Sequence, residues 1–342
     1  MQRCIELAQL GRGMVAPNPM VGAVLVYDDR IIGEGYHEEY GQAHAEVNCM
    51  NSVSAQDKLF ISSSTLYVSL EPCSHFGKTP PCSDLIIQNG IRKVVIGCAD
   101  PFPQVNGKGI EKLENAGVKV VKYILEKECK ELNKRFFCFH TRQRPYIILK
   151  WAQTANGRIG SDLRERLLIS NPNTNRLVHK WRSEEATILI GTNTALLDDP
   201  SLTNRLWRGN SPVRMILDLP LRLPQSLKIY NRQQPTVIFN LIKKEKEDNL
   251  TYYRITDQED IIEQILTACY SLHLQSILVE GGAKLLQSFI NAGKWDEARI
   301  ITNEALVINR GLKAPLLKHH QLVSTEKISS DTIHYYVKEA ES

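Results

Sequence analysis

The chain has 342 residues, a formal net charge of +4 at pH 7, 42% hydrophobic residues and 23% charged residues. At roughly 150 residues per domain this length predicts two domains, and the composition is that of a globular protein. The small net charge argues against a nucleic-acid partner, which usually requires a strongly basic stripe.

No apolar run approaches the roughly 18 residues of a transmembrane helix, so no membrane partner is expected. The N-terminal stretch MQRCIELAQLGRG has no apolar core of the kind found in a signal peptide. The eight cysteines are spread along the chain, unlike those of a short secreted disulfide scaffold. We therefore expect a cytoplasmic protein with reduced thiols, of which one or two are available to a metal.

The first part of the chain alternates strand-like and helix-like segments. Strands are predicted at 20–27, 30–36, 65–70 and 93–98, helices at 43–53 and 84–90, and a helix, a glycine stop and a strand within 109–125. A single Glu- and Lys-rich helix over 126–138 is expected to follow. This order predicts a three-layer α/β/α domain over residues 1–143.

The composition changes at HTRQRP (140–145), and a second α/β domain is predicted over residues 144–342. Its predicted strands are 146–152, 186–191, 213–218, 236–240, 276–280 and 332–337, and its predicted helices are 173–183, 260–271 and 283–293. The charged segment 241–256 is interpreted as a solvated connection. There is no GxGxxG motif after a strand, so the dinucleotide-binding fingerprint is missing.

A metal site is predicted from His44-Ala45-Glu46 and from Pro72-Cys73. Catalytic zinc takes three protein ligands from imidazole and thiolate groups, here His44, Cys73 and Cys82, and leaves one position for water. Glu46 then lies beside that water and moves protons without binding the metal, as in the zinc deaminase signature.

Eight residues separate Cys73 from Cys82, where the general deaminase signature has two. Gly77 and the Pro80-Pro81 pair favour a turn that returns Cys82 to the metal. A structural zinc site would require a fourth protein ligand, for which His37 and His75 are candidates.

A second candidate site lies at the end of the strand in ILVEGGAKLLQSF (277–289). Gly281 and Gly282 leave the backbone N–H groups at the start of the following helix open to an anion such as a dinucleotide phosphate. A tight strand-to-helix turn without a ligand would use the same glycine pair.

The segments PNPMVGAVLV (17–26), HAEVN (44–48), EPCSHFGKTPPC (71–82) and DPFPQVNGKGI (100–110) together resemble the deaminase domain of the bifunctional riboflavin-biosynthesis RibD family. The eight-residue loop distinguishes that family from cytidine and tRNA deaminases. The resemblance implies a cytidine-deaminase-like fold, one Zn²⁺ and hydrolytic removal of the 2-amino group from 2,5-diamino-6-(5-phosphoribosylamino)pyrimidin-4-one. It assigns Asn18 to the pyrimidine ring and His75 and Lys78 to the ribose phosphate.

The segments LKWAQTANGRIG (149–160), TNTALLDDPSLTNR (192–205) and 277–289 resemble the reductase domain of the same family, whose fold is similar to dihydrofolate reductase. The resemblance covers about residues 1–305. It implies NADPH-dependent reduction of the ribosyl group to ribityl, a small-molecule substrate, and a homodimer or higher homo-oligomer. By position the resemblance assigns the NADPH contacts to Ala152, Leu168, Thr194, Asp198, Gly282, Ala283, Lys284, Leu285, Leu286, Gln287 and Ser288. It assigns the substrate contacts to Arg166, Arg182, Leu202, Arg205 and Glu280.

The stretch ERLLIS (165–170) departs from this family pattern, since Arg166 and Leu168 stand where the family has a serine and a tryptophan. One alternative is therefore a deaminase whose reductase domain has lost catalysis and serves dimerisation or substrate binding. A deaminase of nucleic-acid bases is a second alternative, which would call for a basic face and aromatic stacking positions. A non-enzymatic protein stabilised by zinc is a third.

Overall fold

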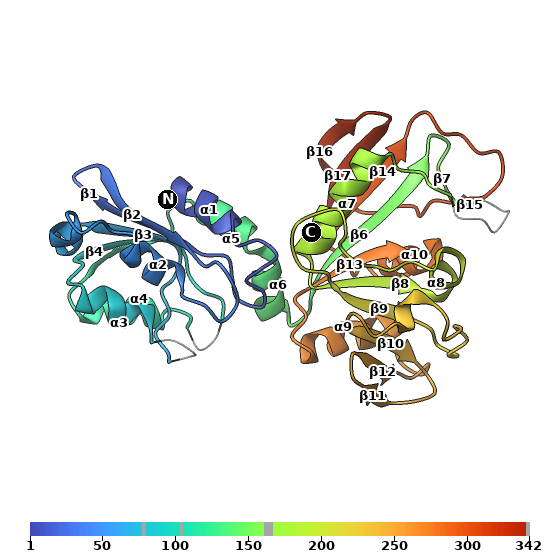
Figure 1. The fold of residues 1–342 in the computed structure, drawn as a ribbon, viewed down its shortest axis with the longest axis horizontal. Coiled ribbons are helices and arrows are strands. Elements are labelled where there is room, and N and C mark those ends of the chain that lie inside the picture. Colours follow the sequence, from blue (N-terminus) through green and yellow to red (C-terminus); the bar gives the residue numbers. More distant parts are fainter. Residues whose placement is uncertain (77–79, 103–104, 161–166, 340–342) are drawn as a thin grey trace. The chain divides into compact units, whose positions relative to one another are not determined.

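The computed structural model describes residues 1–342 except 77–79, 103–104, 161–166 and 340–342 (Figure 1). It divides into two compact units, Met1–Gln143 and Arg144–Ser342. Within the described ranges, no helix has both the length and the apolar character needed to cross a membrane.

The first unit is built on a mixed sheet with strand order β2-β1-β3-β4-β5. The central strand pair β1 and β3 is antiparallel, whereas β3, β4 and β5 run parallel. Its strands are β1 (Gly22–Tyr27), β2 (Arg30–Tyr36), β3 (Thr65–Leu70), β4 (Lys93–Cys98) and β5 (Lys119–Val121). Its helices are α1 (Gln2–Gln9), α2 (Ala45–Asn51), α3 (Cys82–Gln88), α4 (Lys108–Asn115), α5 (Glu126–Leu132) and α6 (Lys134–Arg142), with a 3-10 turn at Lys58–Ser63.

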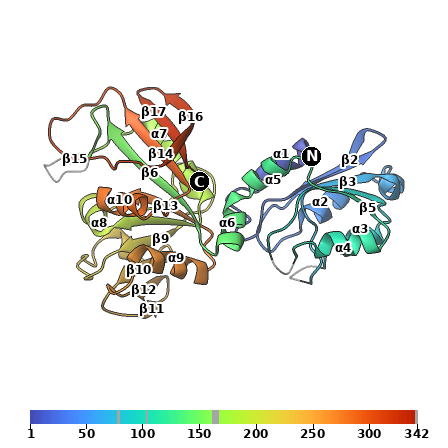
Figure 2. The same ribbon diagram turned by 180° about the vertical axis from the view of Figure 1, so that it is seen from behind.

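Both faces of this sheet are covered by helices. Ala23 and Leu25 of β1 belong to one core cluster together with residues of α2, α3 and α4. Val24, which points to the opposite face because side chains alternate along a strand, packs with residues of α1. Figures 1 and 2 show α2, α3 and α4 on one side of the sheet and α1 and α5 on the other. The predicted three-layer α/β/α architecture is therefore confirmed.

The single helix predicted over 126–138 is wrong, because the chain breaks between α5 and α6 at Asn133. The Asn133 side chain is buried and turns toward the backbone of Met20, just before β1. Its Oδ1 accepts the Met20 N–H at 2.8 Å and its Nδ2 donates to the Met20 carbonyl at 2.8 Å. This long-range pairing occurs where the helix is interrupted. The sequence has no Gly or Pro there from which the interruption could be predicted.

The second unit contains a large sheet with order β11-β12-β10-β9-β8-β13-β6-β14-β17-β16 and a two-stranded sheet of β7 and β15. Among the described residues, the seven strands from β12 to β14 in that order run parallel, and β11, β17 and β16 are antiparallel to their neighbours. The strands are β6 (Tyr146–Thr154), β7 (Arg158–Gly160), β8 (Thr187–Gly191), β9 (Val213–Leu217), β10 (Thr236–Asn240), β11 (Glu245–Glu247), β12 (Leu250–Arg254), β13 (Ser276–Gly281), β14 (Glu297–Asn303), β15 (Leu312–Lys313), β16 (His320–Ile328) and β17 (Asp331–Lys338). The helices are α7 (Pro172–Glu184), α8 (Thr192–Asp198), α9 (Ile261–Ser271) and α10 (Ala283–Asn291), with a 3-10 turn at Lys228–Tyr230.

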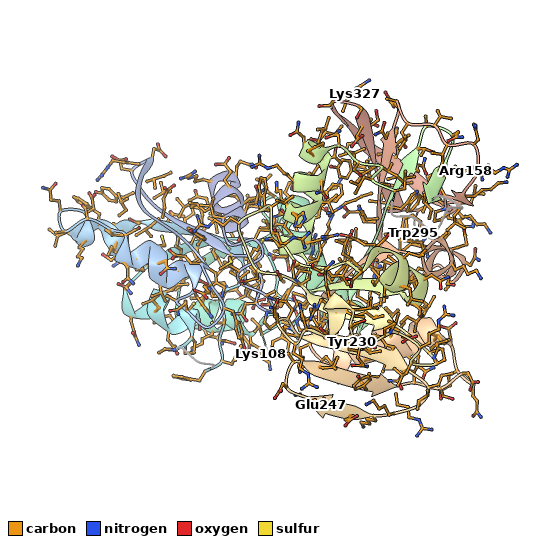
Figure 3. All side chains as sticks on the ribbon, turned by 45° about the vertical axis from the view of Figure 1, so that its right-hand side comes forward. Lys108, Arg158, Tyr230, Glu247, Trp295 and Lys327 are labelled. Atoms are coloured by element: carbon orange, nitrogen blue, oxygen red, sulfur yellow. The ribbon has the colours of Figure 1, made fainter. Side chains whose placement is uncertain are left out.

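The parallel part of the large sheet is also buried on both faces, as expected of parallel strands. Leu189 of β8 packs in a cluster with α9 and α10 that includes the buried Trp295 (Figure 3). Its neighbours Ile188 and Ile190 pack in a second cluster, on the opposite face, with Ala195 of α8.

The interpretation of 241–256 as a solvated connection is wrong. This segment contains β11 and β12, and Leu250 and Tyr252 of β12 are buried in the second core cluster. The apolar alternation of β12 is short and follows a run of charged residues, so it is not recognised in the sequence. The final strand predicted at 332–337 is confirmed as part of β17, whereas β14 and β16 were not predicted.

Candidate active sites

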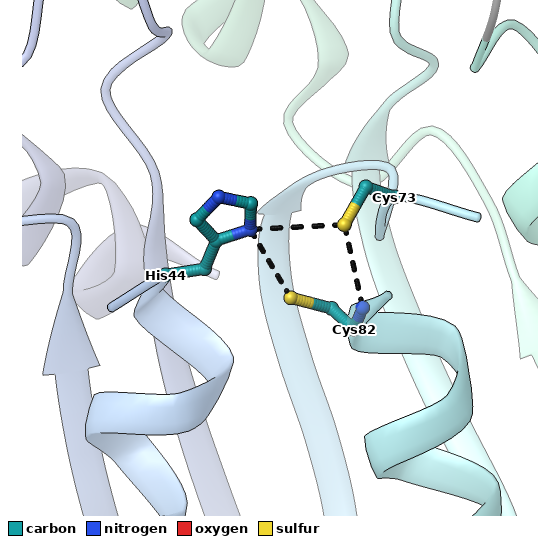
Figure 4. Close-up of side chains that lie close together, drawn as sticks. All are labelled: His44, Cys73 and Cys82. Atoms are coloured by element: carbon teal, nitrogen blue, oxygen red, sulfur yellow. Dashed lines mark hydrogen bonds between the residues drawn. The ribbon is translucent and has the colours of Figure 1, made fainter. Parts of the chain in front are cut away.

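The three predicted zinc ligands come from three separate segments of the first unit (Figure 4). His44 is the residue immediately before α2, Cys82 is the first residue of α3, and Cys73 lies in the loop after β3. His44 and Cys73 are half-buried and Cys82 is buried. The parallel pairing of β3 with β4 places the end of β3, and so Cys73, at the same sheet edge as the loop that follows β4.

The ligand atoms of these residues are spaced as a single metal ion requires. His44 Nδ1 lies 3.7 Å from Cys73 Sγ and 3.3 Å from Cys82 Sγ, and all three atoms lie within 4.8 Å of one another. A tetrahedral zinc with bonds of about 2.0 Å to nitrogen and about 2.3 Å to sulfur would separate these atoms by about 3.5 Å. The side chains therefore fit Zn²⁺, with His44 binding through Nδ1.

The surroundings of the two sulfurs favour a thiolate at Cys73. A hydrogen bond with the Cys82 thiol lowers the pKa of Cys73, and the Cys82 backbone N–H donates to Cys73 Sγ at 3.3 Å. Glu46, the second residue of α2, is 3% exposed, and burial raises its pKa. A buried carboxyl group beside the metal ligands can both accept and return a proton.

A fourth protein ligand is not found among the described residues. The group of His, Cys, Asp and Glu side chains that could share a metal there consists of His44, Cys73 and Cys82, and residues 77–79 and 103–104 are of none of these types. His37 has both ring nitrogens engaged, with Nδ1 3.0 Å from the Ala43 carbonyl and Nε2 3.1 Å from Asn18 Nδ2. Three protein ligands with an open fourth position are the pattern of a catalytic zinc site rather than a structural one.

Asn18 is held beside this site by His37. The Ala43 carbonyl can only accept, so His37 Nδ1 carries the proton and Nε2 accepts from the Asn18 amide. Burial lowers the pKa of His37, which keeps its ring neutral. The centroids of the His37 and His44 rings lie 5.5 Å apart. The His37 ring therefore lies next to both the Asn18 amide, which it orients, and the metal ligand His44.

Of the two predicted phosphate contacts, Lys78 lies outside the described residues. His75 is half-buried, and its Nδ1 is buried without a hydrogen-bond partner in the described structure. Its ring centroid lies 6.3 Å from that of Phe102. His75 therefore offers an unsatisfied polar atom next to the loop after β4.

Sequence reasoning missed Glu71, which is 3% exposed and precedes the zinc ligand Cys73 by two residues. Its carboxylate accepts four backbone N–H groups, from Asp100 at 3.2 Å, Gly107 at 3.0 Å, Gly109 at 3.0 Å and Ile110 at 3.2 Å. A Cβ on Gly109 would lie 1.9 Å from the Pro72 carbonyl oxygen, so the start of α4 approaches the loop closely. The sequence did contain a signal for Glu71, because an acidic residue stands there directly between an apolar strand and the Pro-Cys dipeptide.

The second unit brings Arg182 of α7 and Glu280 of β13 together. Arg182 Nε and Nη2 donate to the two Glu280 oxygens at 2.9 and 2.6 Å, and Lys150 Nζ of β6 lies 3.9 Å from Glu280. Burial alone would raise the pKa of Glu280, but the charges of Arg182 and Lys150 outweigh it and lower that pKa to about 2. Lys150 was not among the predicted residues, although a lysine inside the apolar run YIILKWA was a visible signal.

Arg205 and Leu202 lie in the segment after α8. The Arg205 N–H donates to His179 Nδ1 of α7 at 2.9 Å, and the Arg205 guanidinium donates to the Thr203 hydroxyl at 2.9 Å. Leu202 is 2% exposed, with a φ of 53°, and its side chain is part of a core cluster. A substrate could therefore reach Leu202 only through its backbone, whereas Arg205 is exposed.

Among the expected NADPH residues, Thr194 of α8 lies against the glycine pair between β13 and α10. Gly282 has a φ of 83°, and a Cβ on Gly281 would lie 2.8 Å from Thr194 Cγ2 of α8. Ala152 lies in β6 and Asp198 ends α8.

Several side chains of α10 are already committed to protein contacts. Leu285 and Leu286 are buried in the core. Gln287 Oε1 accepts the Leu316 N–H at 2.9 Å, and the Ser288 hydroxyl donates to the Lys284 carbonyl at 2.9 Å. The first turn of α10, from Gly282 to Lys284, therefore offers its backbone to a cofactor more directly than its later side chains do. Leu168 is 74% exposed, and Arg166 lies outside the described residues.

The fold and the His-Cys-Cys group define the first unit as a zinc-dependent deaminase, which is followed in the same chain by a second α/β unit. A family model of the cytidine and deoxycytidylate deaminase zinc-binding region matches residues 1–98, and the RibD C-terminal domain matches residues 145–332. The chain is 40% identical over 301 residues to the riboflavin biosynthesis protein RibD of Aquifex aeolicus, covering 86% of this chain and 83% of that protein. It is 33% identical over 317 residues to RibD of Escherichia coli, covering 87% and 84%.

A solved structure from Thermotoga maritima, described as a diaminohydroxyphosphoribosylaminopyrimidine deaminase/5-amino-6-(5-phosphoribosylamino)uracil reductase, matches with a TM-score of 0.89 and 35% identity. The match covers 99% of this chain and 97% of that one. The chain therefore belongs to the riboflavin biosynthesis RibD family. The expected family, both fold classes and the cofactors Zn²⁺ and NADPH are thereby confirmed.

Proposed function

We propose that this chain catalyses two consecutive steps of riboflavin biosynthesis. The first unit deaminates 2,5-diamino-6-(5-phosphoribosylamino)pyrimidin-4(3H)-one to 5-amino-6-(5-phosphoribosylamino)uracil and ammonia. The second unit reduces the ribosyl group of that product to ribityl with NADPH. The observation that carries the proposal is the convergence of His44 Nδ1, Cys73 Sγ and Cys82 Sγ with the buried Glu46, which lies two residues after His44 in the first turn of α2.

In the deaminase unit, Zn²⁺ when bound lowers the pKa of a coordinated water to about 7. Glu46 accepts one proton from the attacking water and gives it to a ring nitrogen, and it then passes the water's second proton to the amine, which leaves as ammonia. Asn18, oriented by the neutral His37, donates to the pyrimidine ring, and His75 with Lys78 contacts the ribose phosphate. These roles follow from the resemblance of the motifs, from the hydrogen bonds around Asn18 and from the unsatisfied Nδ1 of His75.

In the reductase unit, NADPH when bound supplies the hydride that adds to the sugar C1′ of the opened imine form. Glu280 lies beside the reacting sugar, and Arg182 and Arg205 bind the substrate, because two guanidinium groups suit an anionic phosphate. Leu202 lines the substrate site through its backbone. The first turn of α10, beginning at Gly282 with its open backbone, holds the NADPH phosphates.

One observation favours a second function, in which the chain acts as a deaminase only. Leu168 is 74% exposed and stands where the family has a tryptophan against the cofactor. The contact between an aromatic ring and the cofactor is therefore lost, and an exposed leucine takes its place. In that case the second unit would serve dimerisation or substrate binding. We also propose a cytoplasmic location, consistent with eight free cysteines, and a homodimer or higher homo-oligomer on the strength of the family resemblance.

The test follows ammonia release and NADPH oxidation in one sample of the zinc-loaded protein supplied with the diaminopyrimidine substrate. Both signals are expected, with NADPH oxidation delayed until deaminated product has accumulated. Ammonia release without NADPH oxidation would replace the bifunctional proposal by the deaminase-only function. Neither signal from a folded, zinc-loaded sample would refute the proposal.

A Glu46→Gln variant tests the proton-transfer role. Loss of the general acid–base group is expected to lower the rate of ammonia release by roughly 10²–10⁴-fold while the zinc content stays the same. NADPH oxidation is expected to persist when 5-amino-6-(5-phosphoribosylamino)uracil is supplied directly. Glu39→Gln, at an exposed position before α2, is the matched control and should leave both activities unchanged.

A further inference from the structure

Arg205 stands at the start of an exposed stretch, residues 205–210. Burial therefore does not fix its position, and its backbone must be anchored in another way if its guanidinium is to meet a substrate reproducibly. One such anchor is His179 of α7, which is 1% exposed and whose Nδ1 accepts the Arg205 N–H at 2.9 Å.

The same face of α7 also holds Arg182, one turn after His179. Arg182 Nη1 donates to the Thr203 carbonyl at 3.4 Å, while its other nitrogens bind Glu280. One helix face thus connects the backbone of the 203–205 segment with the Arg182–Glu280 pair.

His179 can perform this role only in its neutral form, with the proton on Nε2 and the lone pair on Nδ1. Burial, together with the positive charges of Arg182 and Arg205, lowers the pKa of His179 to about 4. At neutral pH the ring is therefore an acceptor. A protonated ring would turn an N–H toward the Arg205 N–H and break the anchor.

We infer that His179 is a positioning residue of the reductase site, which orients Arg205 toward the substrate by accepting its backbone N–H. The inference rests on the proposed function of the second unit and extends it to a residue that the motif comparison did not include. His179 does not itself contact the substrate, so its effect passes through Arg205.

The experiment measures the KM for 5-amino-6-(5-phosphoribosylamino)uracil, the KM for NADPH and ammonia release in variants of the full chain. His179→Leu removes the acceptor and is expected to raise the substrate KM about tenfold, equivalent to ~1.4 kcal/mol, with the KM for NADPH and ammonia release unchanged. His179→Asn places an amide oxygen near the position of Nδ1 and should restore the substrate KM to within about threefold of the original. Asn175→Leu, at an exposed position of α7, controls for a leucine in this helix.

A double-variant comparison shows whether His179 acts through Arg205. Arg205→Met alone is expected to raise the substrate KM, and adding His179→Leu to it should change that value by less than about twofold. Independent, multiplying effects of the two changes would overturn the inference, as would an unchanged substrate KM in His179→Leu.

Failure of the proposed function has a different signature. In that case the unmodified protein would not oxidise NADPH, or Arg205→Met would leave the substrate KM unchanged. If His179→Leu does not fold, seen as lost NADPH binding, the two amide variants decide. His179→Gln carries its oxygen near the position of Nε2 and should raise the substrate KM, whereas His179→Asn should not; equal values would overturn the inference.

Discussion

Two opposing electrostatic effects meet at the side chain of Glu280. Removal from water disfavours its charge, whereas Arg182 and Lys150 favour it, and the net result is a pKa of about 2, below the ordinary 4.5. Because the folded-state pKa is the lower one, the carboxylate stabilises the folded state fully above pH 4.5. That stability is lost as the pH falls toward 2.

Replacing Glu280 by Gln is expected to destabilise the second unit by about 3–5 kcal/mol, because two largely buried cations then lack their carboxylate. The four tryptophans of the chain, Trp151, Trp181, Trp207 and Trp295, all lie in the second unit, so urea unfolding followed by tryptophan fluorescence reports on it selectively. The decline in stability between pH 4.5 and 2 should also be smaller in the variant.

Glu263→Gln is the matched control for this prediction. Glu263 pairs with Lys294 at the surface, where the side chains are 52% and 37% exposed, and such pairs contribute at most about 1 kcal/mol. Equal losses of stability in the two variants would contradict the importance of burial at Glu280.

At the scale of elements, Asn133 stands where α5 ends and α6 begins. Its side chain pairs with both polar backbone groups of Met20 across 113 positions of sequence. Asn133→Ala would leave these buried groups unpaired, at a cost of about 1–3 kcal/mol for each. We expect a loss of about 2 kcal/mol or more in the stability of the first unit.

Thermal unfolding by circular dichroism measures this loss, and tryptophan fluorescence of the second unit serves as the internal reference. Asn115→Ala, at an exposed position at the end of α4, should be nearly neutral. An unchanged unfolding temperature in Asn133→Ala would show that water satisfies the Met20 backbone after the change.

The sequence predicted those elements whose own residues form a clear apolar pattern. β3, β4 and β13 are mostly apolar segments, and the sequence predicted them. In contrast, β16 is exposed along nearly its whole length, and its place at the sheet edge depends on pairing with β17. Strand β12 has two buried residues, Leu250 and Tyr252, and this alternation is too short to stand out beside charged neighbours.

At the scale of the whole molecule, each activity has its own unit and its own core. Removing zinc with a chelator is therefore expected to abolish ammonia release while NADPH oxidation continues when the deaminated product is supplied. Tryptophan fluorescence should stay unchanged, and Zn²⁺ should restore ammonia release. Unfolding of the first unit on chelation, seen by circular dichroism, would instead indicate a structural metal.

The sequence by itself determined the class of chemistry, because short contiguous motifs contain the zinc ligands, the neighbouring glutamate and the glycine turn. His44-Ala45-Glu46, Pro72-Cys73 and Gly281-Gly282 could each be recognised locally. Only the tertiary structure decided which side chains meet across long separations. The Arg182–Glu280 pair spans 98 positions, and the contacts of Lys150 with Glu280 and of His179 with Arg205 likewise join different elements. Such pairings depend on how the helices and strands pack, and no local pattern of residues specifies that packing.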